Sequence, residues 1–570
     1  MLLQTEAAHE SSVRHNLTYL TASVLRSAQL LVPLSPTSEQ PEDELFSMID
    51  EPYIHNLDDD SLLQVFRYCR LVEDSWNLRL KWRKLAHVCQ RWRYLVFDSS
   101  SILDMCLCLT NNSPSIHTLC HLPSLPLVID YSDETRMARK DENNIHLGLQ
   151  RHGRVCRVAL QAPSSSLRIL LKPMNKPFPR LGDLSLLSTT TEELSPVLPE
   201  TLLAPFLRRL ALHGIGLPKG LSLLSPMIAL STLSLTHIPY SCYFPPGHLV
   251  TQLRGLYCLE ELSIGFAIPI PLPSSEGQLL PAPIPPVTLP ALRRLTFRGV
   301  GVYFDNLVAQ INTPLLEQLS LTLFFEVAFA LVNLTEFIHR TERFRCHVAR
   351  VIFNKEGASI YADHYEQCIF GKFFKSSLNV NVNCETLDWQ IDSAAQVGRA
   401  LGNVLSAVEE LSLDLDADVM PSFWEITLDS TVWHELLLPF IGVTKLYISF
   451  SLTLELSQAL ELVPGELVLE LLPELRELEV ELEIDYAKKV FSAFVEIRES
   501  AGRPVHLWAS PIQAIRRAEA AEPELPPKFH YMDAFGQQYQ YPAMQLISRY
   551  RSLIQTQEET SYSYYYKLRR

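Results

Sequence analysis

Five thiol and imidazole side chains in the first quarter of the chain are of the types that bind zinc. They lie within 16 residues and are Cys106, Cys108, His117, Cys120 and His121. Their spacing matches no standard zinc motif. Cys106 and Cys108 alternate in the sequence MCLCL, where a β-strand would bury them. We therefore expect no metal site and no other cofactor.

A cluster of basic residues just before this region is the other candidate for chemistry, because a basic helix can read DNA. Its members are Arg79, Lys81, Arg83, Lys84, Arg91 and Arg93. Tryptophan and cysteine residues recur between them at helical spacing, which is typical of packing. The net charge of the chain is −15, and this also argues against nucleic-acid binding. We interpret the cluster as a solvated helix face.

Motifs of common catalytic sites are absent from the sequence. There is no G-x-S-x-G, no P-loop, no H-E-x-x-H and no Rossmann glycine run. Only 20 of 570 residues are glycine, so few turns can cradle a phosphate. We expect a protein that is not an enzyme.

Hydropathy and cysteine usage indicate the cell compartment. No apolar run reaches the roughly 18 residues of a membrane span. The first residues lack the basic start and apolar stretch of a secretory signal. The 11 cysteines include no C-x-x-C pair and fit small hydrophobic residues in a reducing environment. We expect an intracellular protein, cytoplasmic and/or nuclear.

Two amphipathic helices are predicted between residues 53 and 97. Asp58, Asp59 and Asp60 precede an apolar set, and aspartates there suit the N-terminus of a helix. A second helix is predicted over Lys81–Phe97. Its apolar seam steps by three and four residues through Trp82, Leu85, Cys89, Trp92 and Val96.

The pattern L-x-x-L-x-L, or a close variant, recurs from Leu181 onward. The matching segments are 181–186, 207–212, 230–235, 259–264, 292–297, 316–321, 408–413, 443–448 and 475–480. The final L-x-L of each predicts a short strand with both apolar residues facing inward. One such unit cannot bury its apolar face alone, so neighbours must stack. Intervening segments such as Phe304–Ile311 and Ala487–Arg498 suit helices, and the proline-rich Ala267–Pro290 predicts a surface loop.

The text from Leu57 to Phe66, together with Trp82–Leu95, resembles an F-box, in the form common in large fungal families. The shared features are the opening leucine and acid, a leucine and a phenylalanine one turn apart, and a closing valine–cysteine pair and tryptophan. Asp58 stands at the usual proline position, and an insertion over Glu73–Lys81 lengthens the middle. The segments PLVIDY (126–131), ELLPELREL (470–478) and AFVEIRESAGRPVHLW (493–508) also resemble these fungal proteins.

The resemblance implies a substrate-recognition adaptor without catalysis. The F-box would bind a Skp-type adaptor, and through it a cullin with its RING subunit, while the repeats bind a protein substrate. The chain would then act by raising an effective concentration. The residues that this resemblance assigns to adaptor contact, or to the core beneath it, are Leu57, Leu62, Phe66, Leu85, Val88, Cys89, Trp92 and Leu95.

The predicted fold is therefore α/β, an N-terminal three-helix F-box followed by an irregular leucine-rich-repeat solenoid. The expected divisions are an arm and linker (1–45), the F-box (46–100), a connecting segment (101–180), the repeats (181–522) and a polar tail (523–570). The alternative is a leucine-rich-repeat interaction scaffold without ligase association, in which the N-terminal helices only cap the repeats.

Negative charge is concentrated in one part of the chain. Residues 409–485 contain 18 acidic and two basic residues, so the remainder is close to neutral. One interpretation is a set of solvated outer helices. The other is a negative surface that receives a basic substrate.

Overall fold

The computed structural model describes most of the chain between residues 57 and 509. The described ranges are 57–71, 85–99, 106–111, 125–133, 137–190, 195–218, 222–268, 286–325, 327, 331–341, 345–363, 377–384, 386–415, 430–460, 471–482, 484–509, 531–532 and 538–539. The expected arm and linker lie outside them. Among the described helices, none is long and apolar enough to cross a membrane.

The chain divides into two compact units. The first comprises residues 1–209 and 214–218, and the second comprises residues 210–213 and 219–570. The elements of the first unit are α2 (Asp59–Leu71), α4 (Gln90–Asp98), β1 (Leu107–Leu109), β2 (Leu127–Ser132), α6 (Arg139–Gln150), β3 (Val155–Ala162), α7 (Ser164–Leu170), η3 (Lys172–Asn175) and β4 (Asp183–Ser188).

The strands of the first unit pair in parallel, in the order β1-β2-β3-β4. β1 lies within the predicted MCLCL strand, and β2 begins at Leu127, the second residue of PLVIDY. Aligned positions such as Leu107 and Leu127, or Val158 and Leu184, bury their side chains together. Helix α6 contacts β1 and β2, and Gly148 leaves room for Leu109 there.

The second unit alternates strands with helices. Its strands are β5 (Arg209–His213, shared at its first residue with the first unit), β6 (Thr232–Ile238), β7 (Glu261–Phe266), β8 (Val287–Thr288), β9 (Arg294–Gly299), β10 (Ile311–Asn312), β11 (Gln318–Leu323), β12 (Val348–Phe353), β13 (Gly357–Asp363), β14 (Leu378–Asn383), β15 (Glu410–Leu415), β16 (Lys445–Ile448), β17 (Glu477–Val480), β18 (His506–Ala509), β19 (Tyr531–Met532) and β20 (Gln538–Tyr539). Its helices are η4 (Ser222–Leu224), η5 (Tyr240–Cys242), α8 (Pro246–Leu253), α9 (Gly301–Val308), α10 (Val332–His339), α11 (Leu387–Ala400), α12 (Gly402–Leu405), α13 (Ser430–Leu437), η8 (Phe450–Leu452), α14 (Thr453–Leu460), α15 (Ile484–Val490) and α16 (Ser492–Ser500).

Most strands of the second unit form one sheet, in the order β5-β6-β7-β9-β11-β14-β13-β12-β15-β16-β17-β18. Pairing is parallel except at β13, which runs antiparallel to both of its neighbours. β8 and β10 form a separate parallel pair, and β19 and β20 a separate antiparallel pair. The fold is thus mixed α/β with a large, mostly parallel sheet, as predicted at that level.

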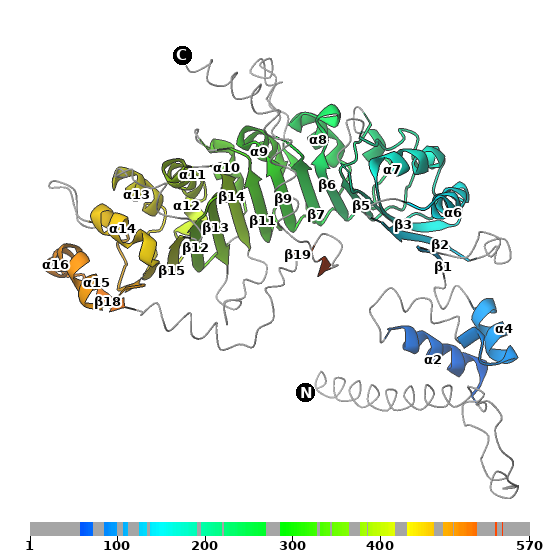
Figure 1. The fold of residues 1–570 in the computed structure, drawn as a ribbon, viewed down its shortest axis with the longest axis horizontal. Helices are drawn as coiled ribbons and strands as arrows, with labels where there is room; N and C mark the ends of the chain where they lie inside the picture. Colours follow the sequence, from blue (N-terminus) through cyan, green and yellow to red (C-terminus); the bar gives the residue numbers. More distant parts are fainter. Residues whose placement is uncertain are drawn as a thin grey trace, which may run out of the picture. The chain divides into compact units, whose positions relative to one another are not determined.

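Each of the nine L-x-L motifs forms a strand, and its two inward residues are buried. The buried residues of adjacent strands are aligned with one another. Leu295, for example, is aligned with Leu262 on one side and with Leu319 on the other. Figure 1 shows the helices of the second unit following one another along one side of this sheet, and successive members of the series α8, α9, α10, α11, α13 and α14 contact each other. The core lies between the two layers, where Phe297 of β9 packs against Phe304 of α9 with ring centroids 5.0 Å apart.

Both segments predicted to be helical between the repeat strands contain helix, but their predicted bounds were wrong. The helix predicted over Phe304–Ile311 begins earlier, at Gly301, because its turn follows directly after β9. The helix predicted over Ala487–Arg498 is two helices, α15 and α16, separated at Phe491, whose backbone leaves the helical region. Within the proline-rich Ala267–Pro290, residues 269–285 lie outside the described ranges, and β8 occupies part of what was predicted as loop.

Candidate protein-interaction surfaces

The N-terminal helical module consists of α2, residues 85–89 and α4. Helix α2 begins where the three aspartates predicted it. Asp58 is its N-cap, because its Oδ1 accepts a hydrogen bond from the Ser61 N–H at 2.7 Å. This backbone hydrogen bond is the main cause that holds the pKa of Asp58 below its ordinary value of 3.8. Asp58 therefore supplies what the N-terminus of a helix needs: a hydrogen-bond acceptor for a backbone N–H that has no partner within the helix.

Arg91 connects the two helices of the module. Its guanidinium donates from Nε at 3.0 Å and from Nη2 at 2.7 Å to Oδ1 of Asp59, and Nη2 also donates to the Leu57 carbonyl at 2.6 Å. Arg91, a member of the basic cluster, thus forms hydrogen bonds that connect α4 to the start of α2. Arg93 donates to the Ala86 carbonyl at 3.0 Å, and the other four members of the cluster lie outside the described residues.

The second helix was predicted as one continuous segment over Lys81–Phe97, and that prediction was wrong. Residues 81–84 lie outside the described ranges, and the helix α4 begins only at Gln90. Cys89 is its N-cap, with an extended backbone (φ −154°, ψ 172°) and a thiol sulfur that accepts from the Trp92 N–H at 3.4 Å. Leu85 and Cys89 therefore do not share a helix face, although their spacing matches one.

The module has a small apolar core. Phe66 and Trp92 meet edge to face, with centroids 4.8 Å apart, and Leu62 is fully buried beside them. The core is completed by Ala86, Val96 and Leu125, and Leu57, Leu63, Leu85, Cys89, Leu95 and Phe97 pack against it while only partly buried.

The eight residues assigned from the sequence thus fall into three groups. Leu62, Phe66 and Trp92 are buried and form the core. Val88 is 42% exposed and makes up part of the surface. The half-buried members are Leu57, Leu85, Cys89 and Leu95. Tyr94, at 61% exposure, is a surface aromatic that the sequence reasoning did not select; its position between Trp92 and Leu95, off the apolar seam, was the available signal.

The second candidate surface is the polar strand face of the second unit. Strand residues alternate in direction, so the positions between the buried leucines point away from the helices. In the middle of the sheet these positions hold amides and hydroxyls: Ser320 and Thr322 on β11, Asn379 and Asn381 on β14, Ser359 and Tyr361 on β13. Asn381 accepts from the Ser359 hydroxyl at 2.8 Å and donates to Asn379 at 3.1 Å. This neutral stretch carries donors and acceptors and no acid–base pair.

Towards β18 the same face becomes acidic. Glu410, Asp414, Glu477 and Glu479 alternate with buried leucines on β15 and β17. The interpretation of the acidic segment as outer helices is therefore wrong for these four, because they lie on strands. Other acidic residues of the segment, such as Glu435, do lie on helices.

Two cations partly balance this acidic end. Arg350 pairs with Asp414, and Lys445 Nζ lies 3.6 Å from Glu479. Tyr447 stands between β15 and β17, and burial together with the charges of Glu481, Asp414 and Glu479 raises its pKa to about 12. Its hydroxyl is therefore protonated at neutral pH.

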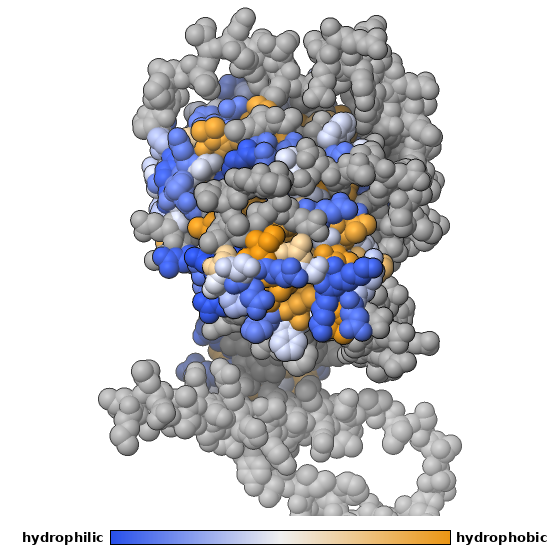
Figure 2. All heavy atoms as spheres, turned by 90° about the vertical axis from the view of Figure 1, so that its left-hand side faces the viewer, coloured by the Kyte–Doolittle hydropathy of each residue, from blue (hydrophilic) through white to orange (hydrophobic). Residues whose placement is uncertain are grey.

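Exposed aromatic residues accompany the acidic end. Trp508 on β18 is aligned with Glu479 and is 59% exposed, and Phe450, just after β16, is 54% exposed. Figure 2 views the molecule from the side of these last elements and shows hydrophobic residues gathered among hydrophilic ones. Acids next to exposed aromatic rings form a surface that suits cationic side chains, which bind both.

No metal site is present among the described residues, where no cluster of three or more potential ligands occurs. Cys106 is buried and Cys108 half-buried, their sulfurs lie 3.8 Å apart, and neither forms a disulfide bond. His117, Cys120 and His121 lie outside the described ranges.

Comparison with known proteins gave no relative: neither a protein-family model nor a curated protein matches the chain.

Proposed function

We propose that the chain is a substrate-recognition adaptor of an SCF-type cullin-RING ubiquitin ligase, with an F-box in the N-terminal helical module and a degenerate leucine-rich-repeat solenoid following it in the sequence. The observation that carries the proposal is the pairing of two parts: a small helical module with apolar side chains left at its surface, and a long strand face with a polar, patterned surface. The helical module suits a partner that is always the same, and the strand face suits a partner that varies.

The helical module supports adaptor docking through the division of its apolar residues. Leu62, Phe66 and Trp92 already pack against one another, so they stabilise the module before any partner binds. Val88 and Tyr94 remain exposed on or next to α4, and burying such side chains against a partner yields binding free energy. The partner in this proposal is a Skp-type adaptor, which connects to a cullin and its RING subunit.

The strand face supports substrate binding. Helices lie on the other side of the sheet, and the strand face offers neutral donors and acceptors in the middle and acids with aromatic residues towards β18. A bound substrate would be held near an activated ubiquitin, so its lysines react at a raised effective concentration and this chain supplies no catalytic group.

The test is a pull-down of the purified full-length chain with a fungal Skp-type adaptor. The diagnostic variant carries Val88→Asp and Tyr94→Asp, because both side chains are exposed and their replacement leaves the core intact. Its control carries Ile228→Asp and Tyr257→Asp, which change one exposed aliphatic and one exposed aromatic residue in the second unit. Aspartates at Leu62 and Trp92 would unfold the module and are unsuitable.

The expected result is adaptor capture by the wild type and the control, with capture by the diagnostic variant reduced at least about tenfold, as loss of a buried apolar contact predicts. No capture by a folded wild-type chain would refute the proposal and leave the interaction scaffold without ligase association. Equal capture by all three proteins would show that the docking surface lies elsewhere.

A further inference from the structure

Strand β18 is the last strand in the order of the sheet, and within the described part of the chain it pairs with β17 alone (Figure 1). The N–H of His506 donates to the Arg476 carbonyl at 2.8 Å, so the backbone groups of His506 point towards β17. Backbone groups of successive strand residues point to opposite sides, so the N–H and C=O of Leu507 point away from β17. Among the described strands, none uses this donor and acceptor, and such an edge is a template for pairing.

The apolar layer beneath the sheet is less complete at β18 than at the strands before it. Leu446 on β16 and Leu478 on β17 are fully buried, and each has a neighbouring strand on both sides. Leu507 occupies the aligned position on β18 and is only half-buried. An added strand would place a side chain next to Leu507 and bury it as its equivalents are buried, which yields binding free energy.

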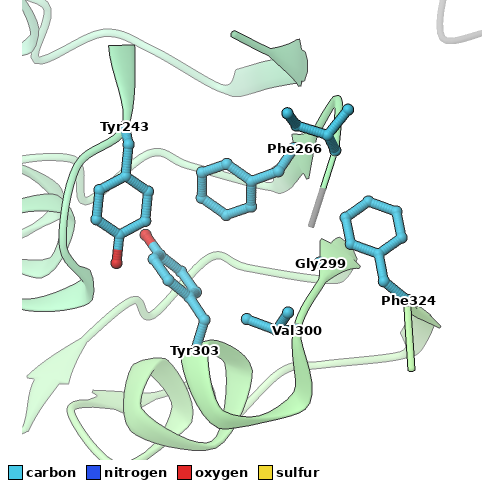
Figure 3. A pocket seen from close by; sticks show the side chains of 7 residues that line it. Tyr243, Phe266, Gly299, Val300, Tyr303 and Phe324 are labelled. Atoms are coloured by element: carbon cyan, nitrogen blue, oxygen red, sulfur yellow. The ribbon is translucent and has the colours of Figure 1, made fainter. Parts of the chain in front are cut away.

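Figure 3 shows how side chains fill the same layer in the interior of the sheet, near β7 and β9. The ring centroids of Phe266 and Tyr303 are 5.0 Å apart, and those of Tyr243 and Tyr303 are 6.1 Å apart. Phe266 is 2% exposed and Tyr303 is 1% exposed, so strands on both sides and the helix layer exclude solvent here. The partial exposure of Leu507 is therefore a property of the edge and not of the sheet in general.

The polar side of the same edge is complementary to a basic partner. Trp508 is 59% exposed and is aligned with Glu479, whose carboxylate lies 3.6 Å from Lys445 Nζ. Glu477 is aligned with His506, is exposed, and forms no ion pair with any described residue. A long cationic side chain on an added strand would lie beside the Trp508 ring and within reach of these carboxylates, and both attract a cation.

The two sides of the edge together define the partner. Successive side chains of a strand alternate between the faces of a sheet, so an added segment must place apolar residues beside Leu507 and basic residues beside Trp508. A second copy of β18 fits less well, because it would bring its own Glu477 and Glu479 to the edge and like charges oppose each other. The observations therefore favour a segment of another protein.

We propose that β18 accepts an additional β-strand from a partner protein, an extended segment in which apolar and basic residues alternate. Its main chain pairs with the backbone of Leu507, its apolar side chains cover the Leu507 side chain, and its basic side chains contact Trp508 and the neighbouring acids. The inference rests on the proposed function only for the fate of the partner as a substrate. Strand addition itself requires no adaptor.

The test measures binding of fluorescein-labelled octapeptides to the purified full-length chain by fluorescence polarisation. One probe alternates valine and lysine, and the other has the same composition in two blocks, so that charge is equal and only alternation differs. Leu507→Pro removes the N–H that faces the edge and keeps the hydrogen bonds to β17, because proline is tolerated on the outer side of an edge strand. Trp508→Ser removes the exposed ring. The control is Trp389→Ser, at a tryptophan of α11 that is 44% exposed.

The expected result is binding of the alternating peptide in preference to the block peptide, weakened at least about tenfold by Leu507→Pro and by Trp508→Ser and unchanged by Trp389→Ser. Circular dichroism checks folding, and if Leu507→Pro does not fold, Trp508→Ser and the two peptides decide. Equal binding of both peptides, full binding by either folded edge variant, or no binding would each overturn the proposal. So would a dimeric chain that Leu507→Pro makes monomeric, because a second copy would then occupy the edge. Adaptor pull-down is a separate measurement, so either proposal can fail alone.

Discussion

Asp58 illustrates what one residue does for the helical module. Its carboxylate caps α2, and the hydrogen bond from Ser61 lowers its pKa below 3.8. A lowered pKa means that the stabilisation is fully present above pH 3.8 and is lost as the pH falls through the lower folded-state pKa. We expect Asp58→Ala to speed amide hydrogen exchange at Ser61, whereas Asp58→Asn keeps a cap and loses the pH dependence. Unchanged exchange in Asp58→Ala would exclude this cap.

Arg498 illustrates a buried charge that the sequence does not reveal. Its side chain is 1% exposed and donates to the carbonyls of Leu472 at 3.3 Å, Pro473 at 3.4 Å and Leu475 at 2.9 Å. Leu472, whose carbonyl accepts one of these hydrogen bonds, has its backbone in the left-handed region at φ 47°. In Arg498→Met the Leu472 carbonyl would keep the Leu475 N–H and the Pro473 carbonyl would keep Arg503, but the Leu475 carbonyl would lose its donor. We therefore expect a loss of about 1–3 kcal/mol in the free energy of unfolding. Chemical denaturation checks this, and the control Arg254→Met, at an exposed arginine after α8, should cost less than about 1 kcal/mol.

At the residue scale, seven of the eight residues chosen from the sequence pack in or against the module's apolar core, and spacing alone could not separate the buried members from the exposed one. Trp92 and Val88 both belong to the apolar text, yet one is 3% and the other 42% exposed. This difference in exposure arises because the predicted helix is interrupted at Cys89, whose thiol caps the start of α4. A cysteine N-cap is not among the common capping residues, so the helix start was invisible in the sequence.

At the element scale, the L-x-L motif predicted its strands well because strand direction and burial both follow from a period of two. The region between Leu323 and Glu410 was missed. There the sheet gains the antiparallel strand β13 between β14 and β12, so its order departs from the order of the chain. The alternation in LNVNVN (378–383) was a strand signal without the leucine motif, and pairing order is a tertiary property that no local pattern encodes.

Shared burial between strands makes a prediction at the same scale. Leu295 is 1% exposed and aligned with Leu262 and Leu319, so Leu295→Asp places an unpaired charge among three strands. We expect a loss of more than about 4 kcal/mol, with proteolysis spreading over β7 to β11. Thr296→Asp, on the exposed side of the same strand, is the control and should leave these strands protected. Cleavage confined to β9 would argue against stacking as the source of stability.

At the scale of the whole molecule, charge is segregated although the composition shows only a moderate excess of acid. The net charge is −15, and residues 409–485 carry 18 acidic and two basic residues. Because Glu410, Asp414, Glu477 and Glu479 lie on strands, part of this charge forms one surface with Tyr447 and is not dispersed over helices. Such a surface raises the local concentration of cations and speeds the association of a basic partner.

The prediction for the whole molecule is that this surface, and not net charge alone, binds basic peptides. Glu477→Lys with Glu479→Lys should weaken binding of a lysine-rich decapeptide at least about tenfold and reduce the salt dependence of its affinity. The control variant, Glu336→Lys with Glu499→Lys, changes the net charge equally at exposed helix positions of α10 and α16. Fluorescence polarisation at several salt concentrations separates the two causes. If both variants lose affinity equally, long-range charge is responsible and the strand face has no special role. If only the strand variant loses affinity, the binding surface is the strand face itself. The same alternation that buries Leu478 and Val480 then also creates this surface.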